Sequence, residues 1–188
     1  MSLIKGLKLK INYSKSVEEL VKAGKYAYVN SDITSDSFPS SESGTANLEA
    51  VIFEPKDYSS SEGILKEMET VGLKPATLKE LLEFGIKYPK EQLKHYVVAL
   101  GSVWRYPFGG RHVPYLWGYV SERRLDLLWF DSSWDQDDRF LACKVSRTLG
   151  TLDSGSLEKE HKHLWTVKEL VCSCGEVKSL WVKRWVGK

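Results

Sequence analysis

Apolar runs of strand length follow one another between Tyr96 and Arg147, and this stretch constrains the fold more than any other part of the sequence. The runs cover residues 97–104, 112–120, 123–130 and 139–145. In the third run, Leu125 and Leu127 alternate with charged residues, which is typical of a strand with one buried face. Short polar or glycine-containing segments separate the runs, so we expect a mainly antiparallel sheet with chain reversals at 109–110 and 121–122.

Helix signals precede this stretch. A serine-capped segment that ends at Gly24 predicts a short first helix. Two longer helices are predicted: one over residues 59–72, and one within the segment 73–89 that starts at the capping box formed by Thr77 and Glu80. The sequence therefore predicts an α+β fold in which two helices pack on a twisted, mainly antiparallel sheet.

The first half of the chain also contains strand and loop signals. Lysines alternate with aliphatic residues over 4–13, a pattern typical of an edge strand. Residues 48–55 read as a buried strand, and the Ser- and Asp-rich segment 31–47 as a loop. We expect residues 1–147 to form a single α+β domain.

A polar connector follows Arg147 and leads to two strand-like runs, 163–171 and 177–186. These runs predict a C-terminal β-hairpin extension within residues 148–188. The extension contains three tryptophans, at positions Trp165, Trp181 and Trp185. Because large aromatic side chains are seldom left fully in water, we expect the hairpin to pack on the preceding domain.

Charge and cysteine usage suggest the compartment. The 188 residues carry a formal net charge of +2, with lysine and arginine concentrated towards both ends. No apolar run approaches the roughly 20 residues that a membrane span needs, and no export signal is recognisable at the N-terminus. We therefore expect no membrane partner. The three cysteines are a poor disulfide framework because their number is odd, which favours a cytoplasmic location.

Two motifs stand in the order of a known fold. The helix start GLKPATLKEL spans residues 72–81, and the strand RFLACK spans residues 139–144. Residues 70–147 thereby resemble the C-type-lectin-like fold in its bacterial branch, which includes formylglycine-generating-enzyme-like domains and ligand-binding proteins diversified by retroelements. They also resemble uncharacterised bacterial proteins that share an ALGSVW…GGR…RFLA pattern. The copper-binding cysteine pair of formylglycine-generating enzymes has no equivalent there, because Cys172 and Cys174 lie beyond the matched region.

The best candidate binding segment is RYPFGGRH, residues 105–112, with the aromatic residues around it. Glycines allow close backbone approach, arginines supply forked donors, and aromatic rings supply apolar faces for stacking, although such rings equally fill a core. The predicted ligand-binding residues are Trp104, Arg105, Tyr106, Phe108, Arg111, His112, Trp117 and Trp134.

Two clusters have metal-binding residue types, but we expect no metal and no cofactor. The first consists of the acids Asp131, Asp135, Asp137 and Asp138, whose spacing fits no EF-hand and which nearby arginines can neutralise. The second consists of His161, His163, Cys172 and Cys174, in which each pair is spaced more tightly than in usual zinc sites.

The function that these features favour is a non-enzymatic module that recognises a ligand or a protein, presenting 104–117 and 131–138 as loops beside a rigid sheet. One alternative is an enzyme with an unrecognised, possibly metal-dependent site, for which Asp135, Asp137, Arg111 and His112 are the first candidates. Another is a nucleic-acid accessory protein that uses the basic, tryptophan-rich tail. The ligand and the oligomeric state stay open.

Overall fold

The computed structural model describes residues 4–144, 164–171 and 177–184, with side chains described from residue 6 to residue 144. The chain divides into two compact units, residues 1–147 and residues 148–188, and each is described by itself.

The first unit is built on a nine-stranded sheet. The strand order is β1-β3-β9-β5-β7-β8-β2, with β4 paired to β9 and β6 paired to β7. Among the strand pairs of residues 4–144, only β5–β9 and β2–β8 are parallel. The strands are β1 (Ile4–Asn12), β2 (Tyr28–Val29), β3 (Thr45–Phe53), β4 (Leu73–Pro75), β5 (Tyr96–Val98), β6 (Trp104–Arg105), β7 (Arg111–Tyr119), β8 (Glu122–Trp129) and β9 (Asp138–Lys144).

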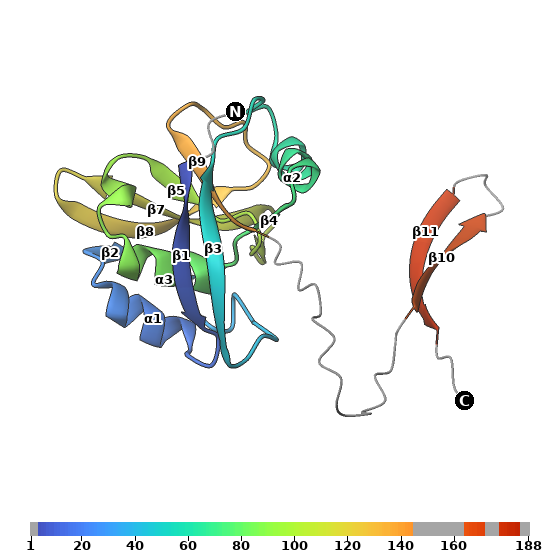
Figure 1. The fold of residues 1–188 in the computed structure, drawn as a ribbon, viewed down its shortest axis with the longest axis horizontal. Coiled ribbons are helices and arrows are strands. Elements are labelled where there is room, and N and C mark those ends of the chain that lie inside the picture. Colours follow the sequence, from blue (N-terminus) through green and yellow to red (C-terminus); the bar gives the residue numbers. More distant parts are fainter. Residues whose placement is uncertain (1–3, 145–163, 172–176, 185–188) are drawn as a thin grey trace, which may run out of the picture. The chain divides into compact units, whose positions relative to one another are not determined.

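Helices cover both faces of this sheet. Helices α1 (Val17–Gly24) and α3 (Leu78–Lys87) contact each other, and α3 also contacts β1 and β7 (Figure 1). Helix α2 (Ser61–Thr70) contacts β4, and the short 3-10 helix η1 (Glu91–Leu93) contacts β7. The predicted α+β class and the mainly antiparallel sheet are confirmed. The described residues contain the three predicted α-helices, and the short α1 packs on α3 and buries Val17 and Leu20 in the core.

Period-two alternation divides the core into two layers. On β3, Ala50 and Ile52 belong to the cluster under α1 and α3, whereas Val51 and Phe53 belong to the cluster with α2. On β9, Leu141 and Cys143 lie in the first cluster, and their neighbours Phe140 and Ala142 in the second. Successive side chains of a strand point to opposite faces, so a strand buried on both faces reads as a continuous apolar run.

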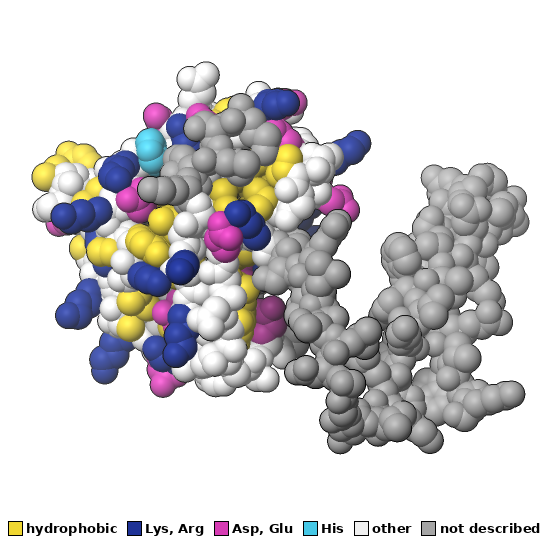
Figure 2. Space-filling view, viewed as in Figure 1, with side chains coloured by type: hydrophobic (Ala, Val, Ile, Leu, Met, Phe, Trp, Pro, Cys, Tyr) yellow, Lys and Arg dark blue, Asp and Glu magenta, His cyan; other side chains and the backbone are white. Residues whose placement is uncertain are grey.

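The predicted edge strand is confirmed. Strand β1 stands at the end of the sheet order, with Lys8 and Lys10 exposed and Leu9 buried. The Nζ atom of Lys87 and the hydroxyl of Tyr88 both donate to the carbonyl of Lys8, at 2.6 and 2.8 Å, which occupies one acceptor of the open edge. Figure 2 shows basic side chains scattered over the drawn face among apolar and acidic ones.

The predicted strand over residues 97–104 is divided in the structure into β5 and β6. The break lies at Gly101, whose backbone N–H donates to the carbonyl of Ala76 at 2.9 Å. A Cβ atom at Gly101 would lie 2.6 Å from the carbonyl oxygens of Pro75 and Ala76. The chain therefore leaves the sheet to pack backbone against backbone at the start of α3, and only glycine fits there.

The predicted end of the first helix at Gly24 is confirmed, and Lys25, the residue after it, takes the left-handed conformation, at φ 51°. One other local prediction needs correction. The β7–β8 reversal is centred one residue earlier than predicted, because Val120 takes φ 58° immediately after Tyr119, the last residue of β7.

The loop before β3 is held to α1 by one carboxylate. Glu18 accepts hydrogen bonds from the backbone N–H and the hydroxyl of Ser35, both at 2.7 Å. These bonds lower the pKa of Glu18 from 4.5 to about 2. Because the folded-state pKa lies below the ordinary value, this interaction stabilises the fold above about pH 4.5 and is lost as the pH falls towards 2.

We expect Ser35→Ala to raise the pKa of Glu18 back towards 4.5, because the hydroxyl donor is removed. Titration of the Glu18 side-chain carboxyl carbon by NMR measures this shift. Ser37→Ala, in the same loop but bonded to Thr34, is the control and should leave the Glu18 titration unchanged. Identical Glu18 titrations in the wild type and Ser35→Ala would contradict the assignment.

The second unit contains β10 (Leu164–Val171) and β11 (Val177–Arg184), which pair antiparallel with Val171 opposite Val177. The structure thus has a hairpin where two strand-like runs were predicted, and its packing on residues 1–147 stays a prediction. Among the described helices, none combines the length and apolar character that crossing a bilayer requires.

Candidate ligand-binding site

A row of aromatic side chains crosses three neighbouring strands. Trp104 of β6 lies opposite His112 of β7, and His112 lies opposite Trp129 of β8. Directly opposed residues of antiparallel strands share one face, so the three rings stand side by side. Their ring centroids are 5.8 Å apart for Trp104 and His112, and 4.4 Å for His112 and Trp129.

The β6–β7 turn adds two more rings. Tyr106 packs on Trp104 with centroids 5.3 Å apart, and Phe108 packs on Tyr106 at 5.5 Å. The turn closes through the Tyr106 N–H, which donates to the Gly110 carbonyl at 3.1 Å. Gly109 and Gly110 take φ values of 110° and 89°, which side chains other than glycine rarely adopt. The predicted reversal at 109–110 is confirmed.

These rings border an open hollow of about 400 Å³, called here the aromatic hollow. It is lined by Asn30, Asp32, Trp104, Tyr106, Phe108, Gly109, His112, Leu127 and Trp129. Three of the rings are well exposed: 38% of Tyr106, 54% of Trp129 and 90% of Phe108 are accessible to solvent. Folding does not bury them, so they are available to a ligand.

Gly110 also makes room for Trp129. A Cβ atom at Gly110 would lie 2.2 Å from the Cζ3 atom of the Trp129 ring, whereas a Cβ at Gly109 would meet nothing within 4 Å. The second glycine of the pair therefore lets the indole lie against the turn. Gly109 is thus required by its backbone conformation alone, and Gly110 by its conformation together with the contact with Trp129.

Polar groups form one side of the hollow. The Asn30 Nδ2 donates to Asp126 Oδ1 at 2.7 Å, and the Asn30 Oδ1 accepts from the Asp32 N–H at 3.0 Å. The backbone N–H of Asn30 donates to the carbonyl of Leu125, which ties this loop to β8. Asp32 is half-buried, and within the described residues its carboxylate has no ion-pair partner.

The two predicted arginines lie on the opposite face. Arg111 pairs with Asp131 and with Glu62, the latter at 2.8 Å, and its guanidinium lies 4.2 Å from the Phe130 ring centroid. Hydrogen bonding to Arg111 lowers the pKa of Asp131. Arg105 is exposed and opposes Arg111 across the strands, so it shares that face. Neither arginine lines the aromatic hollow.

The two remaining predicted residues lie elsewhere. Trp134 is buried, donates from Nε1 to the Ser61 hydroxyl at 3.0 Å and packs edge-on against Phe140. It anchors the 131–137 segment to the core instead of presenting a ring to solvent. Trp117 lies near the other end of β7, with Arg124 over its ring at 5.0 Å.

Sequence reasoning therefore found Trp104, Tyr106, Phe108 and His112, but missed Asn30, Asp32, Leu127 and Trp129 as lining residues. Trp129 stands two residues after Leu127, so both side chains take the same face of a strand, and this spacing was visible in the sequence. Asn30 and Asp32 gave no local signal, because the pairing of β2 with β8 brings them there.

The carboxylates of Asp135 and Asp138 accept hydrogen bonds within their own turn. Asp138 accepts from the Asp135 N–H at 2.9 Å, and Asp135 accepts from the Asp137 N–H at 2.8 Å. Burial raises the pKa of Asp138. Within residues 6–144, no three His, Cys, Asp or Glu side chains are placed to share a metal ion. His161, His163, Cys172 and Cys174 lie outside the described residues.

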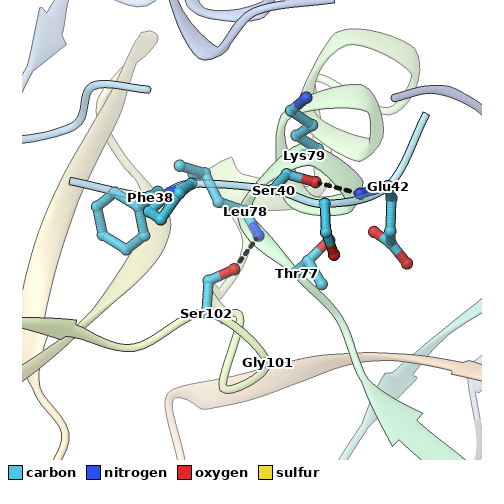
Figure 3. Close-up of a pocket in the computed structure, with 10 residues that line it drawn as sticks. Phe38, Ser40, Glu42, Thr77, Leu78, Lys79, Gly101 and Ser102 are labelled. Atoms are coloured by element: carbon cyan, nitrogen blue, oxygen red, sulfur yellow. Dashed lines mark hydrogen bonds between the residues drawn. The ribbon is translucent and has the colours of Figure 1, made fainter. Parts of the chain in front are cut away.

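A second hollow, of about 240 Å³, lies at the start of α3 (Figure 3). The segment 38–42 and residues 77–79 border it, together with Gly101 and Ser102. The N–H of Leu78 donates to Ser102 Oγ at 2.9 Å, and the N–H of Thr77 donates to Glu80 Oε2 at 2.7 Å. These helix-terminal donors are occupied by the protein itself, so the aromatic hollow is the better candidate.

Glu80, in the first turn of α3, is a fully buried carboxylate. Its Oε1 accepts from the Tyr13 hydroxyl at 2.7 Å and from the Lys74 Nζ at 2.9 Å. Burial and the bond to Glu80 raise the pKa of Tyr13, and burial raises the pKa of the neighbouring Cys143 thiol to about 12. A protonated, buried thiol is a poor nucleophile, so Cys143 offers no reactive group here. The network is structural: through Glu80 it joins α3 to Lys74 of β4 and to Tyr13, the residue after β1.

Comparisons of this chain with protein-family models, with curated proteins and with solved structures find no match. The geometry of the described residues is therefore the ground for any proposal of function.

Proposed function

We propose that this protein is a non-enzymatic recognition module that binds a small ligand, or a side chain of a protein partner, in the aromatic hollow. The observation that carries this proposal is the row Trp104–His112–Trp129 across three strands, with Tyr106 and Phe108 added by a glycine turn. Aromatic rings on a rigid sheet provide contact area with little loss of conformational entropy on binding.

The exposure of these rings supports the proposal. Phe108 contacts Tyr106 but is 90% accessible, so it contributes little to the stability of the fold. Exposed apolar clusters with polar groups at their edge, such as Asn30 and Asp32 here, are typical of binding sites.

The relationship to the C-type-lectin-like fold and a cytoplasmic location are parts of the same proposal. What supports the first is the order of a capped helix, a Gly- and aromatic-rich strand region and the short strand β9. What supports the second is the odd number of cysteines.

The enzyme alternative finds less support. Its candidates Arg111 and His112 are adjacent on β7 and make contacts on opposite faces, with Phe130 and with Trp129 respectively. Asp135 and Asp137 bond within their own turn. The side chains of the basic tail, on which the nucleic-acid alternative rests, lie outside the described ones.

A panel of four probes tests the proposed function: choline, methyl glucoside, benzyl alcohol and benzoate. We expect at least one to shift the indole N–H signals of Trp104 and Trp129 in NMR spectra. Trp129→Ala should weaken that binding at least about tenfold, measured on Trp104, because a central aromatic contact is lost.

Tyr119→Ala is the matched control for this experiment. Tyr119 is an exposed aromatic residue at the end of β7, the strand that also carries His112 at its other end, and it does not line the hollow. Binding in this variant should stay within about twofold of the wild type. Probe-induced shifts that avoid both indoles, or that survive Trp129→Ala, would sink the proposed function.

A further inference from the structure

The charges around the aromatic hollow point to the chemical class of its ligand. We infer that the hollow accepts an organic cation, of which a quaternary ammonium group is the simplest form. The inference rests on the proposed function and makes it more specific.

One carboxylate, one imidazole (His112) and no lysine or arginine line the hollow within the described residues. Asp32 borders it and has no ion-pair partner in the described part of the chain, whereas Asp126, which accepts from the Asn30 Nδ2 at 2.7 Å, does not line it. The side chains of Arg105 and Arg111, although they belong to the same hairpin, share the opposite face with Asp131. Strand alternation therefore separates the positive charges of this hairpin from its aromatic rings.

The rings themselves favour a cation. The face of an aromatic ring carries negative electrostatic potential and attracts a cation that lies over it. The ring of Tyr106 is inclined at 74° to that of Trp104 and at 57° to that of Phe108, and His112 is inclined at 44° to Trp129.

Rings inclined in this way do not form one flat platform, which a planar base or the face of a sugar requires. A compact trimethylammonium group has no preferred plane, so it can contact several inclined rings at once. With a carboxylate at the edge of the hollow, this arrangement is suited to a cation that is too weakly hydrated to resist removal from water.

The test compares choline with 3,3-dimethylbutan-1-ol, which has the same shape without the charge. We expect choline to shift the indole signals of Trp104 and Trp129 with an affinity about tenfold higher than the neutral alcohol. Asp32→Asn should weaken choline binding several-fold and leave binding of the alcohol unchanged. Asp36→Asn, an exposed acid of the same loop that does not line the hollow, is the matched control and should change neither.

The outcomes separate this inference from the proposed function. Equal affinity for the two probes, or tighter binding of methyl glucoside or benzoate at the same indoles, overturns the cation and leaves the recognition site standing. If no probe reaches the indoles, both fail. A loss of choline binding in Asp36→Asn equal to that in Asp32→Asn would show a general charge effect and also overturn the assignment of Asp32.

Discussion

Replacing Glu80 by alanine is expected to lower the free energy of unfolding by about 2–4 kcal/mol, because the buried Tyr13 hydroxyl loses its acceptor and α3 loses its cap, whereas Lys74 is 39% exposed and can be hydrated. Glu80 is 0% exposed and accepts bonds from Tyr13, Lys74 and the Thr77 N–H. Burial alone would lower the pKa of Lys74, but the bond to Glu80 raises it. Without the carboxylate, the Tyr13 hydroxyl loses its acceptor inside the core.

The chain contains a matched control for this substitution. Glu19 forms the same capping box at the start of α1, accepting from the Ser16 N–H at 2.8 Å, but it is exposed. Glu19→Ala should cost about 1 kcal/mol or less, the usual value for a lost cap. Urea unfolding followed by circular dichroism measures both variants. Equal losses would show that Glu80 acts only as a helix cap and that the buried network contributes nothing.

Gly110→Ala is expected to destabilise the fold by about 1–3 kcal/mol, the range for an over-packed site combined with an unfavourable backbone conformation. It should also abolish probe binding in the aromatic hollow. Gly110 takes φ 89°, and the new methyl group would lie 2.2 Å from the Trp129 ring. Since the turn is held by its own hydrogen bonds, the exposed indole is the part that must move away.

Gly109→Ala separates the two effects. Gly109 takes φ 110°, but a Cβ atom there meets nothing within 4 Å. The variant should therefore lose stability through backbone strain, and its probe affinity, measured on the same indole signals, should fall far less than that of Gly110→Ala, although Gly109 lines the hollow. If both glycine variants bind the probe as the wild type does, the position of Trp129 does not determine the site.

Local patterns in the sequence determined the elements. The Thr77–Glu80 box predicted the start of α3, and the residue alternation around Leu125 predicted β8. These signals are short-range, because a cap or a half-buried strand needs only its near neighbours. The break at Gly101 was missed because its cause, the carbonyl of Ala76, is distant in sequence.

Part of the candidate site was predicted because its signal is also short-range. Its aromatic residues stand together between Trp104 and His112, so their density is visible in the sequence. By itself, the sequence determined that this hairpin is aromatic and turns on two glycines. Only the tertiary structure decided that its arginines face away and that Asn30 and Asp32 join its rings, because which face a side chain takes depends on strand register, and register is set by pairing across the whole sheet.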